Sequence, residues 1–232
     1  LRAITPQTTP FFGFGHAISI GIISSSGDFV GSSIGEATEG FARDVLMYDQ
    51  AGCLSPHFLF VTGESRQGAM SEISLNFSAA LARAADALNV PPVTDAGVAI
   101  AVREARDMAH FDGFRVTGDP DLRWTLAWTD SLDCTIPAAV GQGVVYLLPT
   151  AETDGSDILQ RLGHLRGRIS SAGVSGEISG ELRASLLDSG VSRLCKPGEM
   201  QTPPLDWANG GRNLLEELLK VTHNTETKVD TR

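Results

Sequence analysis

The stretch that decides the fold covers residues 42–61 and reads ARDVLMYDQAGCLSPHFLFV. It passes from a helix-like segment, through a turn that carries Gly52 and Cys53, into the apolar run HFLFV. A short apolar run that follows turn residues is typical of a buried strand. The stretch therefore predicts a helix–turn–strand unit with a cysteine in the turn ahead of the strand.

Helical and strand-like segments alternate on both sides of this unit. The helix before the turn is predicted over residues 33–47, where Ser33 and Glu36 have the spacing of a capping box. Such alternation is typical of an α/β fold with a largely parallel sheet flanked by helices. The expected helices cover residues 33–47, 71–89, 94–109, 157–169, 179–189 and 212–222, and the expected strands cover residues 14–24, 57–61, 113–117, 123–129, 143–148 and 191–195.

The composition limits the classes of protein to which the chain can belong. It has 232 residues, of which 42% are apolar and 20% charged, as is ordinary for a globular protein of one large or two small domains. No apolar run approaches the ~18 residues that suggest a membrane span. The formal net charge of −10 repels a polyanionic backbone, so we expect no nucleic-acid partner.

The cysteines and histidines give no metal or disulfide pattern. Cys53, Cys134 and Cys195 are odd in number and far apart, with no CxxC spacing, and the five histidines lack metal-ligand spacing. We therefore expect no metal and a reducing, cytoplasmic location. The phosphate-binding GxxxxGK[ST] motif is absent, and the glycines of GFGHAISIG do not follow the GxGxxG order.

Two interpretations of Cys53 are open from the residues alone. Cysteine is among the most commonly buried residue types, so Cys53 can be a small apolar residue that sits in a turn. A turn ahead of a buried strand can also expose a thiol at a sheet edge, where backbone N–H groups stabilise the thiolate. For Cys134 and Cys195 a structural role is the better interpretation.

Residues 42–61 also resemble the catalytic-cysteine segment of the acyl-CoA reductase family of bacterial luminescence, an offshoot of the aldehyde dehydrogenase superfamily. FGHAISIGII resembles the strand before the cysteine helix, and ILQRLGHLRGRISSAGV resembles the late helix and its following turn. GVSRLCKPGEMQTPPLDWANGGRNLLEELLKV resembles the C-terminal signature of the family. The resemblance implies an aldehyde dehydrogenase-like catalytic domain over residues 1–222 and leaves 223–232 as a polar tail.

This resemblance implies a reaction and two site residues. Cys53 corresponds to the catalytic nucleophile, and Gln50, three residues earlier, has a supporting role. The implied enzyme reduces a fatty acyl-CoA, or an acyl group on a protein, to the aldehyde with NADPH through a cysteine-linked acyl-enzyme. Most of the nucleotide-binding domain is expected upstream of residue 1, so no residue is assigned to cofactor binding. Superfamily members usually form dimers or tetramers, so a homo-oligomer is expected.

One departure from the superfamily bears on the reaction. Hydrolytic aldehyde dehydrogenases carry a water-activating Glu ahead of the Gly-rich strand, whereas PFFGFGHAIS at residues 10–19 has no carboxylate. Its absence favours reduction of a thioester over oxidation of an aldehyde. Two alternatives stay open: another aldehyde dehydrogenase relative, such as a semialdehyde or acyl-phosphate reductase, and a non-catalytic domain that acts as a binding or assembly module.

Overall fold

The computed structural model describes residues 2–4, 6, 15–25, 32–213, 215, 216 and 219. Its strands are β1 (Ile18–Ser24), β2 (Pro56–Thr62), β3 (Arg115–Gly118), β4 (Thr125–Trp128), β5 (Val144–Pro149), β6 (Ile169–Ser175) and β7 (Arg193–Cys195). They form one seven-stranded sheet in the order β3-β4-β5-β2-β1-β6-β7. Only the β3–β4 pair is antiparallel among these strands, which confirms the predicted α/β class with a largely parallel sheet.

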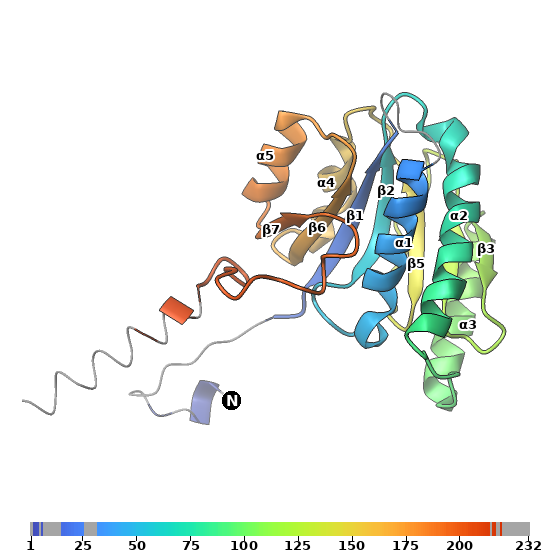
Figure 1. Cartoon of the computed structure of the whole chain (residues 1–232), viewed down its shortest axis with the longest axis horizontal. Coiled ribbons are helices and arrows are strands. Elements are labelled where there is room, and N and C mark those ends of the chain that lie inside the picture. Colours follow the sequence, from blue (N-terminus) through green and yellow to red (C-terminus); the bar gives the residue numbers. More distant parts are fainter. Residues whose placement is uncertain are drawn as a thin grey trace, which may run out of the picture.

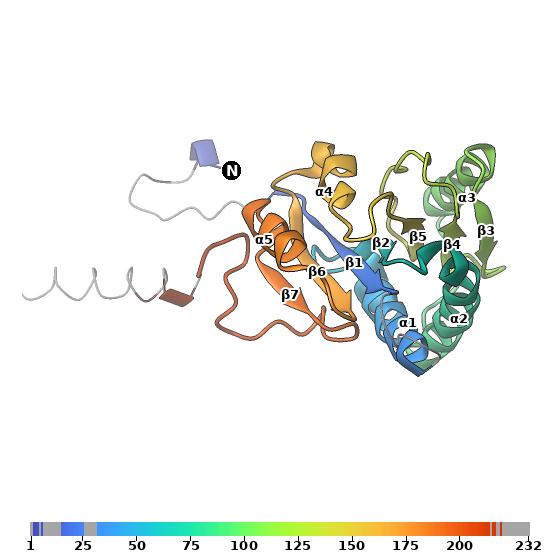
Figure 2. The same cartoon turned by 90° about the horizontal axis from the view of Figure 1, so that it is seen from above.

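Helices cover both faces of the sheet (Figures 1 and 2). On one face lie α1 (Ser32–Leu46) and α2 (Arg66–Ala87), and on the other lie α3 (Ala96–Phe111), α4 (Asp157–Arg161) and α5 (Gly180–Asp188). Each face has its own hydrophobic cluster. The central strands β2 and β5 are buried throughout, because helices exclude water from both of their faces.

α1 packs very closely on the centre of the sheet. Gly21 of β1 and Gly173 of β6 are register partners, and the Phe41 ring of α1 lies against both. A Cβ atom would lie 2.7 Å from Phe41 Cε1 at Gly21 and 2.6 Å from it at Gly173. The missing side chains therefore let α1 approach the sheet, and α1 leads directly into the turn that carries Cys53.

The main difference from the sequence-based expectations is β6. We predicted one helix over residues 157–169 followed by a turn, whereas α4 ends at Arg161 and residues 169–175 form a strand inside the sheet. The sequence ISSAGVS is small and polar, with few of the residues that favour strands. Its strand conformation is stabilised by pairing with β1 and β7 on either side.

The remaining corrections concern the ends of elements. α1 includes Ser33, which is therefore not its N-cap, and α2 begins five residues earlier than expected, at Arg66. Leu88, which lies inside the helix expected over residues 71–89, is the C-cap of α2 and is 38% exposed. α3 begins after Asp95, whose carboxylate accepts a hydrogen bond from Val98 N at 2.9 Å.

The two helices predicted nearest the C-terminus differ in outcome. Ser179, the first residue of the helix expected over residues 179–189, is the N-cap of α5, since its hydroxyl accepts a hydrogen bond from Leu182 N at 3.0 Å. The helix predicted over residues 212–222 does not begin at its first residue, because Arg212 forms an isolated bridge with Asn209. Most of the rest of that range, the tail at 223–232 and residue 14 of the first predicted strand lie outside the described residues.

Candidate active site

Cys53 lies at the amino edge of the parallel sheet, in the connection between α1 and β2. The Ser55 N–H donates to the Gly52 carbonyl oxygen at 3.1 Å, which closes a four-residue turn with Cys53 and Leu54 at its centre. The Cys53 side chain is partly exposed. The thiol is therefore accessible to solvent on a backbone that is held in one conformation.

The chain enters this turn through three consecutive residues in the left-handed conformation. Tyr48, Asp49 and Gln50 have φ values of 57°, 54° and 57°. None of them is glycine, and each such residue costs about 1–2 kcal/mol. The Gln50 side chain offsets this cost in part, because its Nε2 donates to Pro56 O at 2.8 Å and to Val144 O at 3.1 Å.

Gln50 therefore ties the turn to the first residues of β2 and β5. Its side chain is buried, and its Oε1 has no partner among the described residues. It does not line the cavity beside Cys53 described below. Gln50 therefore supports the turn without lining the cavity.

Two serines from neighbouring strands hold the backbone of Cys53. The Ser19 hydroxyl of β1 donates to Cys53 O at 2.8 Å and lies 2.8 Å from the Ser171 hydroxyl of β6. Because Ser19 has a single hydroxyl proton, the Ser171 hydroxyl is the donor of the second bond. Ser171 N also donates to Ser19 Oγ, at 3.2 Å. Both strands therefore determine where the Cys53 turn lies.

Two backbone donors of the turn are unused. The N–H groups of Cys53 and Leu54 donate to no acceptor among the described residues. Free N–H groups beside a nucleophile are the donors that stabilise an oxygen atom as it becomes negative. The turn therefore offers both a sulfur atom and candidate oxyanion donors.

A cavity of about 640 Å³ opens beside Cys53. Its lining comes from segments that are far apart in the sequence and includes His16 and the two arginines Arg168 and Arg212. No aspartate or glutamate is found among the described residues that line it. The remaining lining residues are Gly15, Ala17, Gly167, Ile169, Ser170, Gly190, Asn209 and Gly210.

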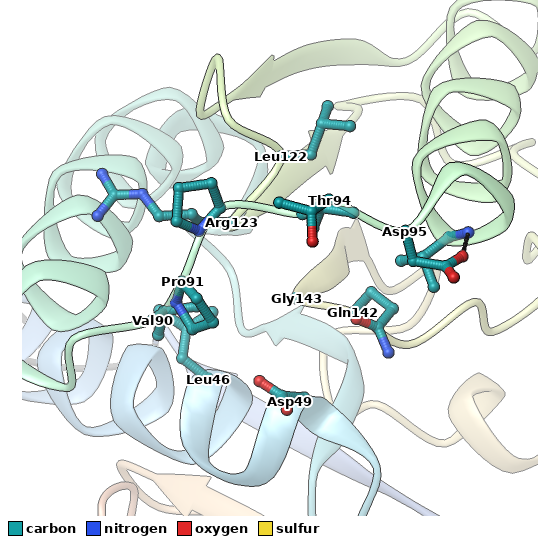
Figure 3. A pocket seen from close by; sticks show the side chains of 13 residues that line it. Leu46, Asp49, Val90, Pro91, Thr94, Asp95, Leu122, Arg123, Gln142 and Gly143 are labelled. Carbon is teal, nitrogen blue, oxygen red and sulfur yellow. Dashed lines mark hydrogen bonds between the residues drawn. The ribbon is translucent and has the colours of Figure 1, made fainter.

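A second cavity, of about 180 Å³, lies at the same edge of the sheet (Figure 3). Asp49 and Gln142 lie on one side of it, and the guanidinium of Arg123 is turned away. Arg123 is engaged elsewhere, with Asp86 and Asp119 at 2.8 Å each. This cavity contains no cysteine among its described lining residues, so we place the candidate active site at the larger one.

A buried carboxylate braces the loop after β7 against this region. Asp44 of α1 is fully buried and accepts hydrogen bonds from Gly198 N at 2.6 Å and Met200 N at 3.2 Å. Gln201 Nε2 donates to Asp44 O at 2.8 Å and to Ser55 Oγ at 2.9 Å. Burial raises the pKa of Asp44 to about 6, although the backbone N–H groups act in the opposite direction.

The other two cysteines are in apolar surroundings. Cys134 and Cys195 each pack against a hydrophobic cluster, and none of the three cysteines forms a disulfide. Burial raises the pKa of Cys195 to about 11 and also raises that of Cys134, despite the Arg161 guanidinium that donates to Cys134 Sγ at 3.1 Å. Both stay protonated near neutral pH, as fits the structural role expected for them.

His57 offers no base to the candidate site. It is the second residue of β2, after Pro56, and burial lowers its pKa to about 4, so the ring is neutral. Its Nδ1 has no partner among the described residues, and His57 does not line the cavity beside Cys53.

In the part of the chain that the structure describes, no group of His, Cys, Asp and Glu is arranged to hold a metal ion.

The structure thus places one predicted residue, Cys53, in the cavity and the other, Gln50, behind it. Sequence reasoning missed Asp44, although it lies three residues after Phe41 on the apolar face of α1, where a carboxylate is unusual. It also missed Ser19 and Ser171, which have no local signal.

Over the described residues, no helix combines the length and apolar character needed to cross a bilayer.

Comparison with known families identifies one match. The family model described as acyl-CoA reductase (LuxC) matches residues 2–221, nearly the whole chain. No curated protein matches the chain.

Solved structures with a similar fold include three bacterial enzymes. An oxidoreductase from Marinobacter aquaeolei has a TM-score of 0.60 at 10% identity, with 85% of this chain and 41% of that chain covered. The P. syringae indole-3-acetaldehyde dehydrogenase AldA, solved with NAD+, has a TM-score of 0.58 at 12% identity (84% and 40% covered). The aldehyde dehydrogenase KauB from Pseudomonas aeruginosa has a TM-score of 0.58 at 11% identity (84% and 40%).

These similarities define the fold. The chain has an aldehyde dehydrogenase-like α/β fold, with its seven-stranded sheet flanked by helices. It spans about two fifths of the length of the three solved structures, which are 40–41% covered.

Proposed function

Since the chain belongs to the LuxC acyl-CoA reductase family, we propose that it reduces a fatty acyl-CoA to the aldehyde, with Cys53 as the nucleophile. The observation that carries the proposal is the partly exposed Cys53, whose backbone carbonyl is held by Ser19 and which lines a cavity of about 640 Å³. Sulfur suits this reaction, because a thiolate is a good nucleophile and later a competent leaving group.

In the first step the Cys53 sulfur attacks the carbonyl carbon of the thioester. A bond forms between sulfur and the acyl carbon, the carbon–sulfur bond to CoA breaks, and CoA leaves as a thiolate that takes up a proton. The N–H groups of Cys53 and Leu54 donate to the carbonyl oxygen while it is negative. When a hydride has been added to the acyl carbon, the bond to Cys53 breaks, and the thiolate and the aldehyde are released.

The hydride requires a nicotinamide cofactor, for which we propose NADPH. The cavity leaves open space for one end of such a molecule, because Gly15 and Gly210 line it and a Cβ atom at either position would meet nothing within 4 Å. The sequence contains no GxGxxG turn to bind the diphosphate of the cofactor. When bound, the cofactor supplies the hydride and becomes the oxidised nicotinamide.

The surroundings of Cys53 support reduction over hydrolysis. Water attacks an acyl-enzyme efficiently only when a base takes its proton. Within the described lining of the cavity there is no carboxylate, and the described part of PFFGFGHAIS, residues 15–19, has none either. An acyl group on Cys53 therefore persists until it is reduced.

The proposal extends to the whole enzyme. Because the chain spans about two fifths of the similar structures, we propose that residues 1–222 act as the catalytic domain beside a nucleotide-binding domain. The site of action would be the cytoplasm, and the assembly a homo-oligomer. Fluorescence titration of this chain alone with NADPH should show weak binding, and submicromolar affinity would contradict the division into two domains.

Intact-mass spectrometry tests the nucleophile directly. After incubation with a fatty acyl-CoA and no NADPH, the protein should gain the mass of one acyl group. Cys53→Ala should abolish the adduct, whereas Cys134→Ala, a matched change at a half-buried thiol, should retain it. An adduct that survives Cys53→Ala overturns the proposed function.

A further inference from the structure

The cavity beside Cys53 gathers positive charge in a protein that is negative overall. Arg168 and Arg212 line it, whereas the whole chain has a formal net charge of −10. An anionic ligand is repelled by such a chain unless a local cluster of cations attracts it. The positive charge of this cavity is therefore a local feature, opposite in sign to the net charge of the chain.

Neither arginine is neutralised by a carboxylate in the described part of the chain. The side chains of Arg168 and Arg212 are exposed and take part in none of the ion pairs or side-chain hydrogen bonds found there. A guanidinium presents a planar fork of N–H donors that matches the oxygen atoms of a phosphate. Both groups are available for such a ligand.

The backbone of Arg168 is anchored beside the strands that hold Cys53. Arg168 N donates to Leu165 O at 2.8 Å, and Arg168 O accepts a hydrogen bond from Ile18 N at 2.9 Å. The next residue of β1 is Ser19, whose hydroxyl holds the Cys53 carbonyl. The cation and the thiol are thus carried by directly connected parts of the sheet.

Arg212 comes from a separate turn. Its N–H donates to Asn209 O at 3.2 Å, and Gly210 and Gly211 between them have φ values of 60° and 77°. Glycine adopts this left-handed backbone without strain, so the chain can form the tight turn here. It carries Arg212 to the same cavity as Arg168.

The opposite edge of the sheet carries the opposite charge. A cavity of about 600 Å³ at the carboxyl ends of β1 and β2 is lined by Glu64, Asp154 and Glu177. Its described lining contains no arginine, lysine or histidine. Of these two large cavities, the one that attracts an anion is the one that contains the thiol.

We propose that Arg168 and Arg212 bind a phosphate group of the acyl donor while its carbonyl group lies at Cys53. The inference rests on the proposed function and adds the chemical class of the donor. A phosphate can be part of CoA, at the far end of the pantetheine arm, or part of an acyl phosphate, where it is bonded to the reacting carbon. The two sources share the same recognition chemistry, and the second experiment below separates them.

Two alkylating reagents test the charge at Cys53 without any acyl transfer. Iodoacetate is an anion and iodoacetamide is neutral, and both modify the same sulfur, so the ratio of their rates reports the local charge. Arg168→Gln and Arg212→Gln should each lower this ratio about threefold, as expected for the loss of one nearby charge. Arg103→Gln, the same change at an exposed arginine of α3, should leave it unaltered. A ratio unchanged in both cavity variants, measured on the Cys53 peptide by mass spectrometry, overturns the proposal.

Three donors of equal acyl chain length then identify the ligand. The rate of Cys53 acylation is measured with acyl-CoA, with an acyl phosphate and with the neutral acyl-pantetheine thioester. The cavity variants should slow a phosphate-bearing donor about tenfold relative to the neutral thioester. Whichever phosphate donor is slowed identifies the source of the phosphate.

Other outcomes count against one proposal or the other. Equal slowing with all three donors overturns the phosphate site, and so does protection of Cys53 from iodoacetamide by NADP+ but not by CoA. If the alkylation ratio falls in the variants but no donor acylates Cys53, the proposed function fails and the anion site stands.

Discussion

The Ser19 hydroxyl donates a hydrogen bond of 2.8 Å to the carbonyl oxygen of Cys53, across 34 positions of sequence. Ser19 belongs to β1, and its hydroxyl is bonded in turn to Ser171 of β6. The position of the thiol is therefore set by the sheet as well as by the turn that carries it.

Ser19→Ala should slow the alkylation of Cys53 by iodoacetamide and destabilise the protein by about 1–3 kcal/mol, because the buried Ser171 hydroxyl and the Cys53 carbonyl lose a partner. Urea unfolding and the alkylation rate measure the two effects. Adding Ser171→Ala should recover part of the stability but not the rate. Ser78→Ala, which removes only a local bond to Leu75 O, serves as the control. An unchanged alkylation rate in Ser19→Ala would show that the strands do not position the thiol.

Gln50→Met should weaken the attachment of the Cys53 turn to β2 and β5. Methionine has a similar shape but no N–H donor, so the carbonyls of Pro56 and Val144 lose their bonds to this side chain. We expect about 2 kcal/mol lower stability and slower acylation of Cys53, measured by urea unfolding and by intact mass. Gln142→Met, at a residue that lines the smaller cavity, is a matched change. Acylation at the wild-type rate would assign Gln50 to stability alone.

Asp44→Asn should alter how stability depends on pH. The carboxyl has its ordinary pKa of 3.8 in the unfolded chain and a pKa of about 6 in the folded protein. Between these values the folded state binds more protons, so the stability that Asp44 contributes falls as pH rises. The unfolding free energy of the wild type minus that of the variant should therefore drop by about 2 kcal/mol from pH 4 to pH 7.

Urea unfolding at a series of pH values measures this difference, and other titrating groups cancel in it. Asp107→Asn, at an exposed position of α3, serves as the control. A difference for Asp44→Asn that grows with pH would mean that the amides of Gly198 and Met200 outweigh burial.

Gly173→Ala should disturb the contact between α1 and the sheet. The added Cβ would lie 2.6 Å from Phe41 Cε1 and 2.7 Å from Met200 Sδ, which forces both side chains to move. Overpacking of this kind costs about 1–3 kcal/mol, and Phe41→Leu in the same protein should relieve part of it. Gly68→Ala inside α2 meets nothing within 4 Å and should instead stabilise by about 0.5–1 kcal/mol. Thermal unfolding distinguishes the two glycines, and equal melting temperatures would refute the close contact.

Local patterns predicted much of the frame of the molecule. Ile34, Ala37, Phe41 and Val45 repeat at helical spacing, and all four are buried on α1. β6 was missed because ISSAGVS has no such pattern and becomes a strand through residues far away in sequence. The information that defines β6 lies in its partners.

The same distinction applies to the candidate site. Cys53 is recognisable within its own segment, because the resemblance there is local. Ser19, Arg168 and Arg212 surround it only after β1 has paired with β6 and the chain has returned from β7. No spacing between these residues in the sequence predicts that they meet.

The left-handed run of Tyr48, Asp49 and Gln50 also bears on the order of events during folding. An unfolded chain rarely visits three such conformations in succession, so this bend forms only when paired strands are present to hold Gln50. We therefore expect Cys53 to reach its native conformation late in folding, after the sheet has assembled. Pulsed iodoacetamide labelling during refolding should show Cys53 reaching its native reactivity after the far-UV circular dichroism signal is complete, and simultaneous recovery would contradict this order. A nascent chain would then carry the cysteine before the framework that positions it exists.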